Sequence, residues 1–215
     1  MRSKLDVIFA VGGADPVRAA VVRALQMGVS AAGDSYEFGR PRTDGHTYGN
    51  DLWRFVWYEM GRELSALPGA SVCHPRGSFL VDLGEAVLYP FRYGADLSAD
   101  VLVFRMADSQ FRRDLLVDPK TVPHLFWPEV VLVPYAANPQ AGLVCAYVGG
   151  ARIDDGDDLL NWQWLEELEL GGLPPGSREE DGGVPPPVTP FNRPPEPELD
   201  LALGDEEATE GDIGG

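Results

Sequence analysis

The segment Ser78–Tyr93, SFLVDLGEAVLYPFRY, constrains the fold more than any other part of the chain. Two β-rich runs, 79–83 and 86–93, flank a short turn at Gly84-Glu85. Their apolar side chains recur with a period of two, which places each set on one face of a sheet. We therefore expect a β-hairpin that needs a partner layer, and the Trp-rich segment before it can supply one. The alternating residues are Phe79, Val81 and Leu83 in the first run and Val87, Tyr89, Phe91 and Tyr93 in the second.

Two amphipathic helices are predicted before the hairpin. Asp15 and Pro16 are typical of a helix start, and apolar residues follow at helical spacing to about Ala31. A second helix is expected over about Asn50–Leu67, and the polar, Gly-rich residues 33–49 between the two helices are expected to form a long loop. The apolar stripe of the second helix contains Trp53, Val56, Trp57, Met60 and Leu64.

Two other segments leave alternatives open. Residues 5–11 could form a strand, or a short helix that begins with the capping box Ser3-x-x-Asp6. Residues 101–105 could form a strand followed by a helix over 108–116, or one helix could run continuously from residue 98. Pro90 cannot donate a hydrogen bond within a β-ladder, which indicates an edge position or a bulge in its strand.

After Pro123 the pattern becomes β. Strands are expected at 129–135, 143–153 and 159–164, with turns at 138–142 and at Asp155-Gly156. Loops this short require antiparallel pairing. The fold class is therefore α+β, with two N-terminal helices packed on a mainly antiparallel β-meander.

The composition changes at about Gly171. Residues 171–215 hold nine of the nineteen prolines and eleven acidic residues against two arginines. Low hydrophobicity combined with high net charge predicts disorder. We expect one globular domain, residues 1–170, followed by an acidic, Pro-rich disordered tail, residues 171–215.

The composition also excludes several classes of function. The net charge of −17 makes direct binding of nucleic acid or of anionic lipid improbable. Cys73 and Cys145 are too few for a disulfide scaffold. No stretch is long and apolar enough for a membrane span, and the N-terminus is a poor signal peptide. A cytoplasmic protein without a cofactor is the expectation.

Carboxylates near the hairpin suggest a metal-dependent nuclease as an alternative. Such an enzyme needs converging acids and a cation. The order of helix, strand and strand resembles the restriction-endonuclease-like fold, but the Glu-x-Lys strand of that family is absent, and only Arg92 could replace its lysine. The other candidates are Glu63 (or Glu59), Asp82 and Glu85. Turn and surface roles are the simpler interpretation of Asp82 and Glu85.

Thiol and metal chemistry have weaker support. Cys73 and His74 are neighbours in a predicted strand, so their side chains point to opposite faces and cannot form a catalytic pair. A base from His46 or His124 would have to fold over Cys73, and a buried structural cysteine is the simpler interpretation. No histidine pair has the spacing of metal ligands. The acidic run 154–158 does not match a calcium loop, so no metal site is predicted.

The leading hypothesis is a non-enzymatic interaction or regulatory protein whose partner is another protein. Two pairs of tryptophans, Trp53 with Trp57 and Trp162 with Trp164, are each expected to share one face of their element and to lie in the core. An exposed pair would instead indicate a protein-binding patch.

The tail offers polyproline segments and a small apolar cluster in acidic surroundings, suited to a basic partner. A third possibility is an acidic mimic of DNA. The tail residues assigned to partner binding are Pro187, Pro190, Leu199, Leu201 and Leu203.

Overall fold

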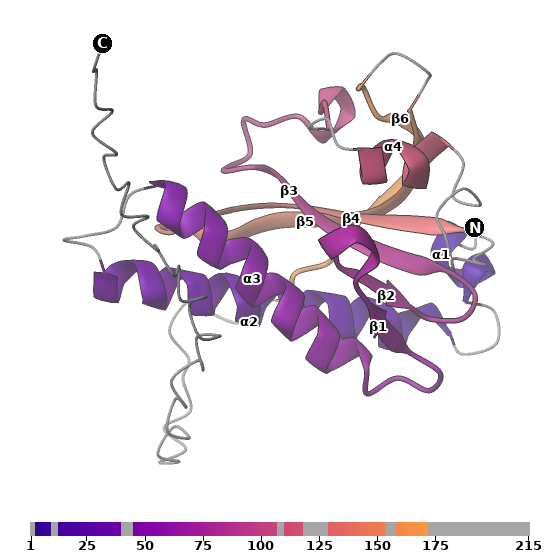
Figure 1. Ribbon diagram of the computed structural model, residues 1–215, viewed down its shortest axis with the longest axis horizontal. Helices are drawn as coiled ribbons and strands as arrows, with labels where there is room; N and C mark the ends of the chain where they lie inside the picture. The colour runs from indigo at the N-terminus through magenta and orange to yellow at the C-terminus, as the bar shows by residue number, and fades with distance from the viewer. Residues whose placement is uncertain are drawn as a thin grey trace, which may run out of the picture. The chain divides into compact units, whose positions relative to one another are not determined.

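The computed structural model describes residues 3–9, 13–39, 45–106, 110–117, 129–153 and 158–171 (Figure 1). Within these ranges a six-stranded, mainly antiparallel sheet is combined with two long N-terminal helices and two short ones, so the predicted α+β class is confirmed. The helices are α1 (Lys4–Ile8), α2 (Ala14–Gly39), α3 (Gly45–Leu64) and α4 (Gln110–Val117), with 3₁₀ turns η1 (Pro75–Gly77) and η2 (Val101–Val103). The strands are β1 (Ser71–Cys73), β2 (Leu80–Asp82), β3 (Val87–Gly94), β4 (Val130–Asn138), β5 (Gly142–Arg152) and β6 (Asn161–Glu167).

The first element is helical, as one of the two alternatives for residues 5–11 predicted. Ser3 Oγ accepts a hydrogen bond from the Asp6 backbone N–H at 3.1 Å, and the Asp6 carboxylate accepts one from the Ser3 N–H at 3.2 Å. This is the predicted capping box. Arg18 of α2 then joins Asp6 at 2.9 Å and Glu166 of β6 at 3.4 Å, which links the first helix to the last strand.

Both long helices extend into residues 33–49, so the long loop predicted there is wrong. Residues 40–44 lie outside the described part. The rings of Tyr36 and Tyr48 meet edge to face at a centroid distance of 5.7 Å. This contact joins the end of α2 to the start of α3. Tertiary packing thus overrides a stretch whose own helix propensity is weak.

Helices α2 and α3 cross closely because α2 presents small side chains to α3. Ala20, Ala24, Gly28 and Ala32 recur every four residues and are buried. A Cβ atom on Gly28 would lie 2.7 Å from Val56 Cα, closer than real Cβ atoms approach a backbone. The absence of a side chain at this position therefore sets the distance between the helices.

The strands lie in sequence order across the sheet, from β1 to β6. The predicted β2–β3 hairpin is present, with Val81 opposite Leu88, and the β4–β5–β6 meander is antiparallel as expected. Strands β3 and β4 are parallel, which alternation alone does not predict, because it is the same for both directions. The connection of residues 95–129 is long enough for the crossover that a parallel pair requires.

Both faces of the sheet are covered (Figure 1). The face that carries Phe79 and Val81 packs on α2 and α3, so the Trp-rich helix is the predicted partner layer of that set. The opposite face carries Tyr89 and Phe91 and packs under the segment that contains η2 and α4. The alternating apolar side chains of the first run therefore lie in one core, and those of the second run lie in a separate core on the other face.

The expectation that Trp162 and Trp164 share one face is wrong. Gly150 pairs with Trp164, but the next residue, Ala151, pairs with Trp162, so that β6 has an extra residue at Gln163. This bulge reverses the alternation. Trp164 joins the core against the long helices, and Trp162 joins the core on the other face.

The segment before α4 is neither the predicted strand nor a continuous helix from residue 98. It forms η2 and a single β-bridge between Arg105 and Leu159, and α4 then follows close to the predicted helix over 108–116.

The turn predicted at 138–142 is confirmed, with Asn138 Oδ1 accepting from the Gln140 N–H at 2.9 Å. In the described ranges, no helix has the length and apolar character needed to cross a membrane.

Candidate functional site

Strand β3 has an open edge beyond the end of β2. Strand β2 pairs with β3 only at Val87 and Leu88, and no other described strand pairs with that side of β3. The Val87 N–H donates to Glu129 O on the β4 side at 3.0 Å. Successive backbone nitrogens of a strand point alternately to its two sides, so the nitrogen of Pro90 points away from β4, toward the open edge. Proline has no N–H to leave unpaired there. Of the two alternatives predicted for Pro90, an edge position or a bulge, the structure has the edge position, and the irregularity of β3 lies later, between Arg92 and Gly94.

A cleft of about 410 Å³ lies beside this open edge, and we call it the edge cleft. Helix α3, strand β3, the residues after η2, helix α4 and strand β4 all contribute to it. Half of its lining residues are aromatic, and among the residues that the structure describes the lining includes two arginines and no aspartate or glutamate. The lining residues are Gly49, Leu52, Trp53, Trp57, Tyr89, Pro90, Phe91, Arg92, Phe104, Met106, Arg112 and Tyr135.

Three aromatic side chains of α3, namely Trp53, Trp57 and Tyr58, form what we call the aromatic ridge. Trp53 is 42% exposed and Tyr58 is 67% exposed. The rings of Trp53 and Trp57 meet edge to face at 4.5 Å, and the half-buried Trp57 stacks on Phe79 at 5.5 Å. The core-facing stripe of α3 passes through Val56 instead, so the Trp53–Trp57 pair is at the margin of the core rather than within it.

A second hollow, of about 490 Å³, lies on the other side of Trp57. It is formed by α3 together with β1 and residues on either side of η1, and it is largely apolar. Trp57 lines both this hollow and the edge cleft, so the ridge lies between two depressions. The lining residues are Trp57, Tyr58, Gly61, Arg62, Ser65, Val72, His74 and Phe79.

Arg92 is held rigidly at the edge cleft by backbone carbonyls. Its Nε donates to Gly94 O at 3.0 Å and to Ala137 O at 3.1 Å, and its guanidinium carbon lies 5.9 Å from the centre of the Tyr48 ring. Within the described part of the chain, Arg92 makes no ion pair with a carboxylate. Burial raises the pKa of Tyr48, so its phenol stays neutral beside this cation.

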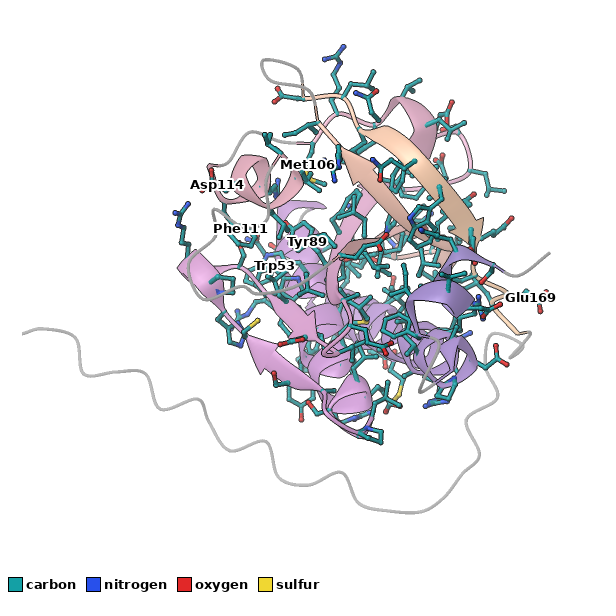
Figure 2. All side chains as sticks on the ribbon, turned by 90° about the vertical axis from the view of Figure 1, so that its right-hand side faces the viewer. Trp53, Tyr89, Met106, Phe111, Asp114 and Glu169 are labelled. Atoms are coloured by element: carbon teal, nitrogen blue, oxygen red, sulfur yellow. The ribbon has the colours of Figure 1, made fainter. Side chains whose placement is uncertain are left out.

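The second arginine of the cleft is fixed by a tyrosine. Arg112 Nε of α4 donates to Tyr89 Oη at 2.8 Å, and the Tyr89 ring meets Phe111 edge to face at 6.2 Å. Figure 2 shows Trp53, Tyr89, Met106 and Phe111 gathered on one side of the molecule, from α3, β3, the segment after η2 and α4. Residues that are far apart in the sequence therefore converge on the cleft.

Two acidic residues of the nuclease hypothesis, Glu63 and Asp82, have other partners. Glu63 accepts from Arg23 Nε at 3.0 Å, and this hydrogen bond holds the pKa of Glu63 below its usual value. Asp82 accepts from the Gly84 N–H at 2.7 Å inside the hairpin turn, and Glu85 follows in the same turn. Among the residues that the structure describes, no three His, Cys, Asp or Glu side chains form a group able to hold a metal ion.

Neither cysteine has the surroundings of a nucleophile. Cys73 is half-buried, its Sγ lies 3.7 Å from Leu80 O, and burial raises the pKa of its thiol. Cys145 is buried, as predicted, with its Sγ 2.9 Å from Tyr93 Oη. A raised pKa leaves less thiolate at neutral pH, which disfavours nucleophilic attack.

Of the three histidines, His74 lies in the described part of the chain and is exposed beside the second hollow. Several other residues singled out in the sequence lie outside the described part. Nothing can be placed for the side chain of His46, for His124, for the acidic run 154–157, or for the tail residues Pro187, Pro190, Leu199, Leu201 and Leu203.

The edge cleft itself was not predicted. Phe104, Met106 and Arg112 belong to the connection between β3 and β4, and no local pattern shows that this connection returns to the edge of β3. The usable signals were Pro90, a proline inside an apparent strand, and Arg92, a charged residue two positions later.

No family model, curated protein or solved structure matches this chain. Function is therefore inferred from the chemistry of the aromatic ridge and of the edge cleft.

Proposed function

We propose that this protein is a non-enzymatic interaction protein that binds another protein through the aromatic ridge of α3. The observation that carries the proposal is the exposure of Trp53, at 42%, and of Tyr58, at 67%. Both residues lie on one helix, on either side of the half-buried Trp57.

The fold does not need these two side chains to fix α3. Leu52, Val56 and Met60 of the same helix are fully buried and anchor it to the core. Apolar area left in water forgoes about 25 cal/mol per Å² of burial. Tryptophan and tyrosine are also the residue types that most often dominate the energy of protein interfaces. Exposed aromatic residues on a rigid helix are therefore suited to burial against a partner.

The hollows beside the ridge support the same proposal. Interfaces bind most strongly where anchor side chains fill pockets at the centre of the contact. The second hollow lies on one side of Trp57 and the edge cleft on the other. A partner could place apolar side chains in these depressions while it covers Trp53 and Tyr58.

The tail provides a second contact in this proposal. Residues 185–190 and 194–197 are rich in proline and favour polyproline II, which binds with little loss of conformational entropy. Leu199, Leu201 and Leu203 follow among acidic residues, a composition suited to a basic surface on the partner.

The test is affinity capture from the native cell extract with four forms of the chain. These are the wild type, the double variant Trp53→Ser/Tyr58→Ser, the control Phe38→Ser and a truncation to residues 1–170. Phe38 is a matched control because it is an aromatic residue that is 94% exposed and lies on α2, outside the ridge. Each protein retained by the wild type is then purified and titrated against all four forms by calorimetry.

A true partner should bind the double variant at least about thirtyfold more weakly, the change expected when interface anchors are removed. It should bind Phe38→Ser as tightly as it binds the wild type. A weaker interaction with 1–170 would add the tail to the interface. If every retained protein binds the double variant as well as the wild type, the ridge is not the binding surface, and magnesium-dependent nuclease activity, compared with that of Asp82→Ala, becomes the next measurement.

A further inference from the structure

The edge cleft has the size and the chemistry of a small-molecule site, which goes beyond the protein-binding role proposed for the ridge. Its volume of about 410 Å³ lies within the range of about 300–1,000 Å³ that ligand pockets usually have. Six of its twelve lining residues are aromatic, and a few polar side chains are among the lining residues. Ligand pockets are typically built in this way.

The charged side chains among the described lining residues of the cleft are both cationic. Arg92 and Arg112 line it, and none of the described aspartates or glutamates does, although the whole chain has a net charge of −17. Each guanidinium is fixed through its Nε, Arg92 by Gly94 O and Ala137 O, and Arg112 by Tyr89 Oη. These bonds preorganise both cations, so little side-chain entropy remains to be lost when an anion binds.

Pro90 disfavours a peptide strand as the occupant of the cleft. An added strand would need alternating N–H and C=O groups along the open edge of β3, and Pro90 has no N–H to offer. The edge is therefore protected against strand addition, while the space beside it stays open. A compact ligand fits this arrangement better than an extended chain.

We propose that the edge cleft binds a small aromatic carboxylate. The ring packs against the aromatic lining that Trp53 and Phe104 contribute, and the carboxylate accepts hydrogen bonds from the guanidinium groups of Arg92 and Arg112. Arginine and carboxylate are geometrically matched, and their charge-assisted hydrogen bonds are stronger than neutral ones. The aromatic walls provide apolar contact and partial exclusion of water.

Three probes test the two halves of this ligand separately on the full-length chain. Phenylacetate has both the ring and the carboxylate, phenylacetamide keeps the ring but is neutral, and acetate keeps the carboxylate without the ring. Calorimetry and saturation-transfer NMR measure binding. We expect a Kd of about 1 mM for phenylacetate, a value typical of a ligand of this size, and binding at least about tenfold weaker for the other two probes.

Variants locate the binding site. Arg112→Gln and Arg92→Gln should each weaken phenylacetate binding about tenfold, and Arg92→Lys should recover part of the affinity. Arg54→Gln is the matched control, because Arg54 is an exposed arginine of α3 that does not line the cleft. Circular dichroism shows which variants are folded, and Arg112→Gln keeps the test decisive if loss of the Arg92 carbonyl contacts prevents folding.

Three results would overturn the proposal. These are the absence of phenylacetate binding at about ten times the expected Kd, equal binding of phenylacetate and phenylacetamide, and unchanged phenylacetate binding by the folded arginine variants. None of them bears on the aromatic ridge, because a protein partner is tested with Trp53 and Tyr58 variants. Trp53 belongs to both surfaces, but failure of one proposal stays distinguishable from failure of the other, because the ligand is tested with Arg92 and Arg112, which are not part of the ridge, and Tyr58 does not line the cleft.

Discussion

Gly28 and Val56 lie against each other where α2 crosses α3, and a Cβ atom on Gly28 would be 2.7 Å from Val56 Cα. Alanine is normally favoured over glycine within a helix by about 1 kcal/mol. At this position the added methyl group has to push the helices apart.

We therefore expect Gly28→Ala to lower the free energy of unfolding by about 1–2 kcal/mol, because the cost of overpacking exceeds the gain in helix propensity. Gly33→Ala, on the same helix, is the control, since the nearest atom to its Cβ would be Pro139 O at 3.9 Å. That variant should be more stable than the wild type by about 0.5–1 kcal/mol. Urea unfolding followed by circular dichroism measures both, and stabilisation by Gly28→Ala would refute this account of the helix crossing.

The two tryptophans of β6 should respond differently to the same substitution. Trp162 Nε1 donates to Val101 O at 3.0 Å, whereas Trp164 Nε1 is buried and has no hydrogen-bond partner among the described residues. Trp162→Phe leaves a carbonyl unpaired, while Trp164→Phe removes an unsatisfied donor. We expect Trp162→Phe to be less stable than Trp164→Phe by about 1 kcal/mol in urea unfolding. Equal losses would show that packing alone determines both effects.

Glu59 makes stability depend on pH in a direction opposite to that of most carboxylates. It is only 7% exposed, and burial raises its pKa above the ordinary 4.5, although Arg62 Nη2 lies 2.7 Å away. Since the folded protein holds this proton more tightly than the unfolded chain, the contribution of Glu59 is fully present below the unfolded pKa and is lost as the pH rises through the folded pKa. Relative to the wild type, Glu59→Gln should therefore gain stability as the pH rises from about 4 to about 7.

Glu63→Gln is the control for this pH dependence. The hydrogen bond from Arg23 lowers the pKa of Glu63, so the stability that Glu63 contributes is present above its unfolded pKa and is lost as the pH falls through the folded one. The urea midpoint of Glu63→Gln should therefore fall below that of the wild type at neutral pH and approach it in acid. If both variants shift in the same direction with pH, the effect of burial on Glu59 has been assigned incorrectly.

The cysteines should be slow to react in the folded protein. Burial, and secondly the charge of Asp82, raise the pKa of Cys73, and Cys145 is buried against Tyr93. At pH 8 we expect iodoacetamide to modify Cys73 more slowly than in the urea-unfolded chain, and to modify Cys145 more slowly still. Asp82→Asn should accelerate modification of Cys73. Peptide mass mapping over time gives both rates, and a folded Cys73 that reacts faster than in the unfolded chain would revive the nucleophile hypothesis.

Much of the fold was predictable because periodicity reports burial directly. The alternation in Ser78–Tyr93 predicted the hairpin, and the helical spacing predicted α2 and α3. The ends of these helices were not predictable, since contacts such as the one between Tyr36 and Tyr48 involve a second element. The bulge at Gln163 was hidden for the same reason, because a bulge is defined by the register of two strands.

The candidate site was much less predictable than the fold. Trp53 was assigned to the apolar stripe of its helix, but position 53 is at the edge of that stripe and is partly exposed. The edge cleft depends on the early end of β2 and on the return of the β3–β4 connection, both of which are tertiary properties. Pro90 was the local sign that the edge of β3 is open.

Site-specific photo-crosslinking tests the central claim, binding through the aromatic ridge, most directly. The photoreactive residue p-benzoylphenylalanine replaces Tyr58 in one form of the chain and Phe38 in another, and each form is irradiated in the cell extract. The ridge account predicts a crosslinked partner from position 58 that is absent from position 38 and that is competed by unlabelled wild type but not by Trp53→Ser. The same products from both positions, or no product from position 58, would contradict it.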